Sequence, residues 1–372
     1  MDRCDVLIVG GGPAGTSCAW GLRHAGLDVI LLDKAVFPRD KVCAGWITPE
    51  VMESLQIDLQ DYCRGRVIQP IRAFRTGLLG GQEVTTDFGK TASYGIRRCE
   101  FDHYLLGRCN VRRRLGESVT SIEHDDHGWL INGDVRASLL VGAGGYFCPV
   151  RRYLKGHTTK HESVVTAQEV EFAIAEGDLH RIGIEPDRPE LFFCDDLRGY
   201  GWCFRKGNYL NIGLGRVDSK HLAAHVSAFC QFLVERGKIG CEIPADFHGH
   251  AYQLYEHRQA RLIDEHAILL GDAAGLAYPQ SGEGIRPAVE SGLLAAEVIV
   301  KAKGRYVTEN LEPYRRAILA RFGKPRKHHL AGALPAGWLH LLGSRLMGSK
   351  WFTRRIVLGR WFLHAGVPAL ST

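Results

Sequence analysis

The chain has 372 residues, which is enough for a large buried core and predicts two lobes rather than one. Hydrophobic residues make up 45% of it and charged residues 24%, a composition typical of a folded globular protein, and no run of about 18 uncharged apolar residues marks a spanning helix. The eleven cysteines are scattered without a CxxC pair, so we expect neither a disulfide framework nor a metal site, and we expect a cytoplasmic location.

The first predicted unit is a nucleotide-binding turn. The apolar stretch at 5–9, DVLIV, predicts a buried parallel strand, and Gly10, Gly12 and Gly15 follow it in GxGxxG spacing before an apolar helical segment. These glycines permit a tight turn, a close approach to a pyrophosphate and close helix–strand packing, and the helix N-terminus offers N–H groups to the phosphates. Asp33 ends the second strand, where it can accept hydrogen bonds from ribose hydroxyls, so the unit predicts FAD or NAD rather than NADP. The alternative is a glycine-rich turn in an unrelated α/β domain.

A second segment, HAILLGDAAG, predicts a strand that runs into Gly271 and Asp272, and a helix opens after Gly282 and Gly284. It resembles the GD motif of FAD-dependent oxidoreductases of the glutathione-reductase structural class. YGIRRCEFDHYLL resembles another signature of that class, in which the arginine, here Arg98, faces the cofactor. The resemblance implies that Asp272 contacts the ribityl chain and pyrophosphate region and that the helix N-terminus stabilises charge on reduced flavin. It implies FAD as the cofactor, bound by Gly10, Gly12, Pro13, Ala14, Gly15, Asp33, Lys34, Ala44, Arg98, Val119, Gly271, Asp272, Gly282, Gly284 and Ile285.

Residues 137–152 occupy the place where flavin hydroxylases carry the pattern G-A-D-G-x-x-S-x-x-R. Gly144 replaces the aspartate and Cys148 replaces the serine, whereas Gly145 and Arg151 are kept. In the hydroxylases this aspartate is linked to both flavin and NAD(P)H binding. The replacement argues against an aromatic-hydroxylase mechanism and leaves the FAD turn in place.

The stretch 163–258 alternates in short apolar bursts that predict an antiparallel sheet. Within it, GYGWCFRKG resembles the P-x-x-Y-x-W-x-F-P signature of the geranylgeranyl reductase family, although both prolines are replaced. Tyr200, Trp202 and Phe204 match, and strand alternation directs all three to one face. They are predicted to bind an apolar substrate over the flavin. The alternative is an ordinary core stripe.

The segment KVCAGW places a thiol just after the first unit. It resembles the K-x-C-G-G segment of the geranylgeranyl reductase family: Lys41, Cys43 and Gly45 match, and Ala44 replaces one glycine. The resemblance implies that Cys43 faces the flavin and substrate and is the catalytic residue, as a proton donor or as a group that tunes flavin reoxidation. The alternative is a buried inert thiol.

The C-terminal segment 321–372 is strongly basic. It holds nine of the 47 Lys and Arg residues and none of the 41 Asp and Glu residues, together with Trp338, Trp351 and Trp361. The cations alternate with apolar blocks, which predicts amphipathic helices and favours an anionic membrane surface over nucleic acid. The alternative is two helices that pack on the FAD domain and cap the substrate cavity.

The predicted fold is α/β, with a Rossmann-like FAD-binding domain, an inserted antiparallel β-sheet substrate domain and C-terminal helices. We expect an FAD-dependent oxidoreductase that reduces or dehydrogenates a carbon–carbon bond of an apolar, isoprenoid-like substrate. A flavin monooxygenase and a non-catalytic flavin-binding protein are the alternatives. No second nucleotide fingerprint is visible, so the reductant is either transiently bound NAD(P)H or a partner protein. The predicted boundaries are 1–75, 95–160 and 260–320 for the FAD domain, 76–94 and 161–259 for the substrate domain, and 321–372 for the basic helical segment.

Overall fold

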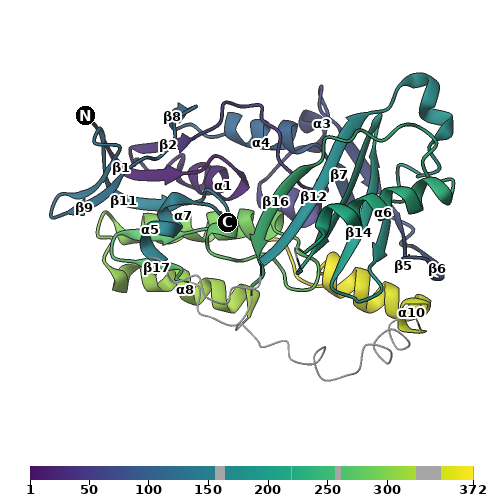
Figure 1. Cartoon of the computed structure of the whole chain (residues 1–372). Helices are drawn as coiled ribbons and strands as arrows, with labels where there is room; N and C mark the ends of the chain where they lie inside the picture. Colours follow the sequence, from purple (N-terminus) through teal and green to yellow (C-terminus); the bar gives the residue numbers. More distant parts are fainter. Residues whose placement is uncertain (156–163, 219, 256–260, 324–344, 372) are drawn as a thin grey trace.

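The computed structural model describes residues 1–155, 164–218, 220–255, 261–323 and 345–371, which form two adjacent lobes (Figure 1). One lobe is built on an eight-stranded sheet and the other on a seven-stranded sheet. The parallel core of the first sheet, the separate, largely antiparallel second sheet and the C-terminal helices confirm the predicted α/β class.

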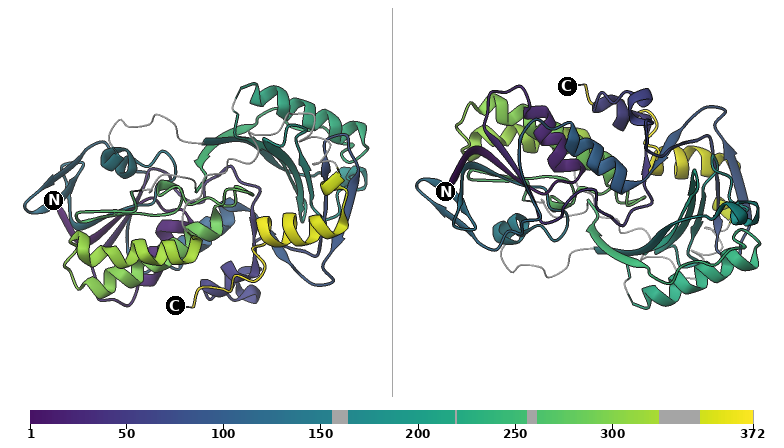
Figure 2. Two further views of the ribbon diagram at one scale, coloured as in Figure 1. Left: turned by 90° about the horizontal axis from the view of Figure 1, so that it is seen from below. Right: turned by 90° about the horizontal axis from the view of Figure 1, so that it is seen from above.

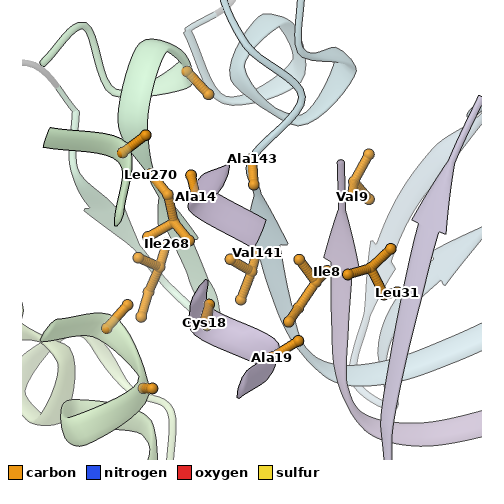
Figure 3. Packing of buried hydrophobic residues seen from close by; sticks show 14 of the residues in the cluster. Ile8, Val9, Ala14, Cys18, Ala19, Leu31, Val141, Ala143, Ile268 and Leu270 are labelled. Atoms are coloured by element: carbon orange, nitrogen blue, oxygen red, sulfur yellow. The ribbon is translucent and has the colours of Figure 1, made fainter. Parts of the chain in front are cut away.

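The first lobe surrounds a mixed sheet in the order β17-β18-β11-β1-β2-β8, in which the strands from β18 to β8 are parallel, while β17 and the β9–β10 hairpin pair antiparallel. Its strands are β1 (Asp2–Val9), β2 (Val29–Asp33), β8 (Arg112–Leu115), β9 (Ile122–Asp125), β10 (Gly128–Ile131), β11 (Val135–Gly142), β17 (Ile263–Asp264) and β18 (Ala267–Leu269). Its helices are α1 (Pro13–Leu22), α2 (Pro49–Ser54), α3 (Leu59–Tyr62), α4 (Arg98–Gly107), α5 (Pro149–Lys155), η2 (Gly271–Ala273), α7 (Ile285–Ala302) and α8 (Thr308–Phe322). Central strands buried on both faces are continuous apolar runs, as the sequence predicts. Figure 3 shows Ala14 and Cys18 of α1 packed with Val141 and Ile268 in this core.

The second lobe is a seven-stranded sheet in the order β16-β12-β15-β14-β13-β5-β6, antiparallel except where β13 pairs with β5. Its elements are β5 (Ala73–Leu78), β6 (Glu83–Asp87), β12 (Val164–Ala173), η1 (Glu176–Arg181), β13 (Glu190–Phe193), β14 (Gly199–Lys206), β15 (Tyr209–Arg216), α6 (Leu222–Glu235) and β16 (His248–Gln253). Helix α6 covers one face, where Phe229 packs against Phe192. The sequence analysis assigned strands alone to 163–258 and missed this helix.

Two further parts connect the lobes. A small sheet of β3 (Trp46–Ile47), β4 (Ile68–Ile71) and β7 (Ser93–Ile96) follows the Cys43 segment and contacts β14. The C-terminal helix, formed by α10 (Lys350–Phe352) and the π-helix η3 (Thr353–Phe362), lies on the face of the seven-stranded sheet opposite α6 (Figure 2).

The first predicted C-terminal helix, around Trp338, lies largely outside the described residues. Within the described ranges, no helix is both long and apolar enough to cross a membrane.

Candidate functional site

The glycine turn between β1 and α1 has the shape that a dinucleotide requires. Gly10 has φ +118°, and a Cβ there would lie 2.5 Å from the carbonyl atoms of Ala143 on the neighbouring strand segment. Gly15 lies against the carbonyl of Gly10 with no room for a side chain. Gly12 is the N-cap of α1 in extended conformation and Pro13 follows, with no side chain capping the first-turn N–H groups. These groups therefore remain available to an anion.

Asp33 is held at the end of β2 by the backbone. Its two carboxylate oxygens accept hydrogen bonds from the N–H groups of Gly11 (2.6 Å) and Ala35 (2.8 Å). Each oxygen keeps a second lone pair, so the carboxylate can still accept bonds from ribose hydroxyls. Lys34 is exposed beside it, and Val119 follows β8, the strand paired with β2. These two residues belong to the β2–β8 edge and not to the cluster around Cys43.

The GD segment brings a second helix N-terminus to the site. Gly271 and Asp272 begin η2, and the N–H of Gly271 donates to the Ser291 hydroxyl of α7 at 3.0 Å. Helix α7 begins at Ile285, which is buried, after Gly284, and the Arg286 N–H in its first turn donates to the Glu283 carboxylate at 2.7 Å. A Cβ on Gly284 would lie 3.2 Å from Asp272 Oδ1, so the carboxylate and the helix N-terminus are adjacent. The two glycine cradles fit a pyrophosphate and a flavin edge, as FAD requires.

Arg98 connects the first lobe to the Cys43 segment. Its guanidinium donates twice to the buried Asp102 carboxylate, at 2.9 and 2.8 Å, and it lies near enough to Cys43 for the two groups to interact electrostatically. Burial lowers the pKa of Arg98, but Asp102 and Cys43 raise it by more, so the net shift is upward and the arginine stays charged. Arg39 Nη2 lies 3.2 Å from Asp102 Oδ2. The N–H of Gly45 lies 3.4 Å from Cys43 Sγ.

Lys41 and His250 extend this polar cluster to Asp272. Lys41 Nζ lies 2.9 Å from Nδ1 of His250, and His250 Nε2 lies 3.8 Å from Asp272 Oδ2. Burial, and next the charge of Arg98, lower the pKa of Lys41 to about 8. Burial also lowers the pKa of His250, although Asp272 acts against the shift. At neutral pH the charged lysine therefore donates to a neutral imidazole.

A buried polar network in the second lobe holds the backbone of Cys43. Asn211 Nδ2 lies 3.3 Å from the Cys43 carbonyl oxygen, and the Cys43 backbone lies near enough to Glu169 to affect the pKa of that carboxyl. Asn211 is fully buried, accepts the Trp202 indole N–H at 2.7 Å, and lies 3.3 Å from Glu169 Oε2. Burial raises the pKa of Glu169 to about 7, although the Cys43 N–H lowers it. The network therefore couples the Cys43 turn to the aromatic strand β14.

Glu171 is the charged counterpart of Glu169 in this network. It forms ion pairs with Lys206 at 2.5 Å and with Arg97 at 3.0 Å, and it lies 3.2 Å from Asn211 Nδ2. Burial alone would raise the pKa of Glu171, but Lys206 and Arg97 outweigh it, so the net shift is downward. The pKa values of two carboxyls on one strand face are therefore shifted in opposite directions, because Glu171 forms ion pairs with two cations and Glu169 forms none among the residues that the structure describes.

The three predicted substrate residues lie on β14 in a single aromatic cluster. Phe204 is 1% exposed and its ring centroid lies 6.0 Å from that of Trp46. The Tyr200 ring lies 6.0 Å from Trp202, and its hydroxyl donates to the Ser281 carbonyl at 2.5 Å, next to the Gly282 turn. Phe362 of the C-terminal helix lies 5.3 Å from Tyr200. Ala44, next to Cys43 in the chain, packs against the same cluster. An apolar wall therefore adjoins the Cys43 turn.

Sequence reasoning missed four residues of this site. Lys41 was used only to recognise a motif, and His250 was given no role in the site. Glu169 and Asn211 are polar residues within otherwise apolar strands. The signal that could have identified them is the alternation of these strands, which places both polar residues at inward-facing positions. The pairing register places Glu169 and Trp202 on either side of Gly213, on one face of the sheet.

The hydroxylase-like turn also contacts the site, without an acid at position 144. A Cβ on Gly144 would lie 3.3 Å from Cys148 Sγ, and Cys148 is buried. Arg151 donates to Gln253 at 2.7 Å and lies 3.4 Å from the Asp272 carbonyl oxygen. Arg151, which follows this turn, therefore contacts the backbone of the GD segment. All eleven cysteines are free thiols, and the described residues contain no group of three or more His, Cys, Asp or Glu side chains that could hold a metal.

Comparisons with known proteins agree with this geometry. The model of the FAD binding domain matches residues 3–321. Menaquinone reductase of Mycobacterium tuberculosis is 28% identical over 323 residues, covering 80% of this chain and 77% of the relative. Digeranylgeranylglycerophospholipid reductase of Methanococcus vannielii is 24% identical over 331 residues, covering 83% and 80%. A solved structure from Thermoplasma acidophilum, described as geranylgeranyl bacteriochlorophyll reductase-like, shares the fold with a TM-score of 0.78, 19% identity and 97% coverage of both chains.

Fold, site and comparisons together define an FAD-dependent oxidoreductase. The chain belongs to the FAD binding domain family, and within it resembles the geranylgeranyl reductases.

Proposed function

We propose that this enzyme reduces carbon–carbon double bonds of an apolar, isoprenoid-like substrate. The observation that supports the proposal is the position of the Cys43 turn. Its neighbour Lys41 is linked through His250 to Asp272 of the GD segment, and Asn211 connects the turn to the aromatic strand β14. A substrate carbon held at this turn meets a thiol, a flavin site and an apolar wall together. The names of the relatives, a quinone reductase and a geranylgeranyl lipid reductase, support the reducing direction.

Some residues of the site bind the substrate, and Cys43 transfers a proton to it. Bound FAD supplies hydride transfer to one carbon of the double bond. Tyr200, Trp202 and Phe204 pack along the apolar substrate and exclude water. Cys43 Sγ, 3.4 Å from the N–H of Gly45, gives a proton to the adjacent carbon, so that a hydride and a proton are added across the double bond. Solvent returns the proton to the thiol, and transiently bound NAD(P)H or a partner reductase returns the two electrons.

The test is a single turnover without oxygen. The holoenzyme is reduced with dithionite under argon and mixed with detergent-dispersed digeranylgeranylglycerophospholipid, and flavin absorbance and product mass are followed. We expect the flavin to reoxidise and the lipid to gain two hydrogens per reduced bond. Reoxidation only after air is admitted, with oxygen appearing in the product, would establish a monooxygenase. No acceleration over free flavin would indicate a non-catalytic flavin protein.

The role of Cys43 is tested in the same assay. Cys43→Ala should retain FAD and lose at least about a hundredfold in the rate of reoxidation by lipid, because general acid catalysis typically contributes this much. Cys63→Ala is the matched control, since Cys63 is exposed on the surface. An unchanged rate in Cys43→Ala would show that the thiol is an inert neighbour of the flavin.

A further inference from the structure

The C-terminal helix, Lys350–Phe362, has two unlike faces. Its buried side chains are Thr353, Val357, Leu358 and Phe362, with a spacing that fits the wide turn of a π-helix. The i→i+5 bond from the Leu363 N–H to the Leu358 carbonyl, 2.8 Å, continues this geometry. Phe362 lies 5.5 Å from Trp46, so the inner face packs on the aromatic wall. Inner packing therefore fixes which side of the helix faces outward.

The outward side is basic and carries an exposed indole. Lys350, Arg354, Arg355 and Arg360 are exposed, and Trp351 is 66% exposed. Just before the helix, Arg345 and Leu346 are also exposed. None of these cations forms an ion pair with a carboxylate in the described part of the chain, and residues 321–372 contain no Asp or Glu. The positive charge of this face is therefore unneutralised within the part of the protein that the structure describes.

The face is held in place at both ends. Arg354 donates to the Asp87 carbonyl at 2.5 Å. After the helix, Arg286 donates to the carbonyls of Val367 and Pro368 at 2.7 and 3.0 Å, and the Leu370 N–H donates to Ser54 Oγ at 2.9 Å. The helix that carries these cations is therefore fixed to the protein before anything binds, which reduces the ordering cost of binding.

We propose that this outer face, Arg345–Leu346 with Lys350, Trp351, Arg354, Arg355 and Arg360, docks on an anionic lipid bilayer surface. Lys and Arg side chains are attracted to anionic headgroups, and an indole is favoured at the membrane–water interface, where one end is apolar and the other wet. The combination of unpaired cations with an exposed Trp and Leu fits a bilayer better than an acidic protein, which would not need the apolar side chains. The inner face of the same helix covers the aromatic wall, so docking places this wall close to the membrane. That the wall belongs to a lipid-substrate site rests on the proposed function.

The experiment is sedimentation of the full-length holoenzyme with vesicles. The vesicles contain phosphatidylcholine with or without phosphatidylglycerol. The test variant is the triple charge reversal K350E/R355E/R360E. The control is R152E/K220E/K303E, which changes the net charge equally at exposed cations elsewhere. We expect the wild type and the control to sediment with phosphatidylglycerol vesicles, and the test variant to lose at least about tenfold in vesicle affinity.

Two results would overturn the proposal: sedimentation of the test variant equal to that of the control, or equal sedimentation of the wild type with vesicles that lack phosphatidylglycerol. Retained flavin absorbance and retained anaerobic reaction with detergent-dispersed lipid show that the test variant is folded. Loss of that reaction in the wild type itself would count against the proposed function and leave docking to be judged by sedimentation. As a second readout, a vesicle-dependent blue shift in Trp fluorescence should disappear in Trp351→Phe.

Discussion

The two lobes recognise their ligands by different means. The FAD lobe offers backbone groups: glycines without room for a Cβ and the N-terminus of α1, which no side chain caps. The sheet lobe offers side chains: an aromatic strand and a buried network through Glu169, Asn211 and Trp202. Recognition by backbone groups tolerates almost no substitution at a few glycine positions. In a side-chain network, the free energy lost on substitution is shared among several hydrogen-bond partners. Substitutions in the two lobes should therefore fail in different ways.

The largest expected effect is at Gly10. Gly10→Ala places a Cβ 2.5 Å from the carbonyl atoms of Ala143 at a φ of +118°, and should reduce FAD affinity by at least about a hundredfold. FAD titration followed by fluorescence quenching measures it. Gly107→Ala is the control, since Gly107 ends α4 with nothing within 4 Å of a Cβ and Ala favours a helix. Near-wild-type affinity in Gly10→Ala would refute backbone recognition here.

The next effect is at the centre of the side-chain network. Asn211→Ala removes the acceptor of the Trp202 indole and a donor to two carboxylates, and should lower the free energy of unfolding by about 3 kcal/mol. Urea unfolding followed by circular dichroism measures the change. Asn310→Ala, at an exposed position on α8, should cost less than about 0.5 kcal/mol. Equal small losses in both variants would show that the network contributes little.

The contributions of Glu169 and Glu171 to the free energy of unfolding should change in opposite directions as the pH rises. The pKa of Glu169 is raised to about 7 in the fold, so its contribution to stability is fully present below its unfolded pKa and is lost as pH rises through about 7. Glu169→Gln should therefore flatten the fall in stability between about pH 5 and pH 8 by up to about 3 kcal/mol. Glu171→Gln should destabilise, and by more at high pH, because the pKa of Glu171 is lowered. Thermal unfolding across this range tests both, and parallel curves for the two variants would contradict the assignment.

The smallest effect concerns Lys41. Because burial lowers its pKa to about 8, it loses its charge above that pH, and binding of the anionic FAD should weaken roughly threefold to tenfold between about pH 7 and pH 9. Lys41→Gln should remove this dependence and Lys41→Arg should shift it beyond the range. FAD titration at several pH values measures it. A pH dependence that persists in Lys41→Gln would assign it to another group.

The sequence predicted the backbone-based FAD site better than the side-chain network of the sheet lobe. Gly10, Asp33 and Asp272 could be found because backbone recognition leaves fixed spacings within a few residues. Asn211 and Glu169 could not be found, because their partners lie far away in the chain, Cys43 in a turn and Trp202 on another strand, and the sequence pattern of a strand does not identify its neighbours. Alternation placed Tyr200, Trp202 and Phe204 on one strand, but what covers them, Phe362, lies about 160 residues away in the chain.

The central claim is that Cys43 stands where flavin and substrate meet. Its direct test is the alkylation rate of each cysteine, followed by peptide mass spectrometry, in the flavin-free protein, the holoenzyme and the holoenzyme with digeranylgeranylglycerophospholipid. We predict that FAD and lipid together slow alkylation of Cys43 at least about tenfold, because they cover the thiol, while the exposed Cys63 reacts at one rate throughout. Alkylation of Cys43 at the same rate in all three samples would contradict the account.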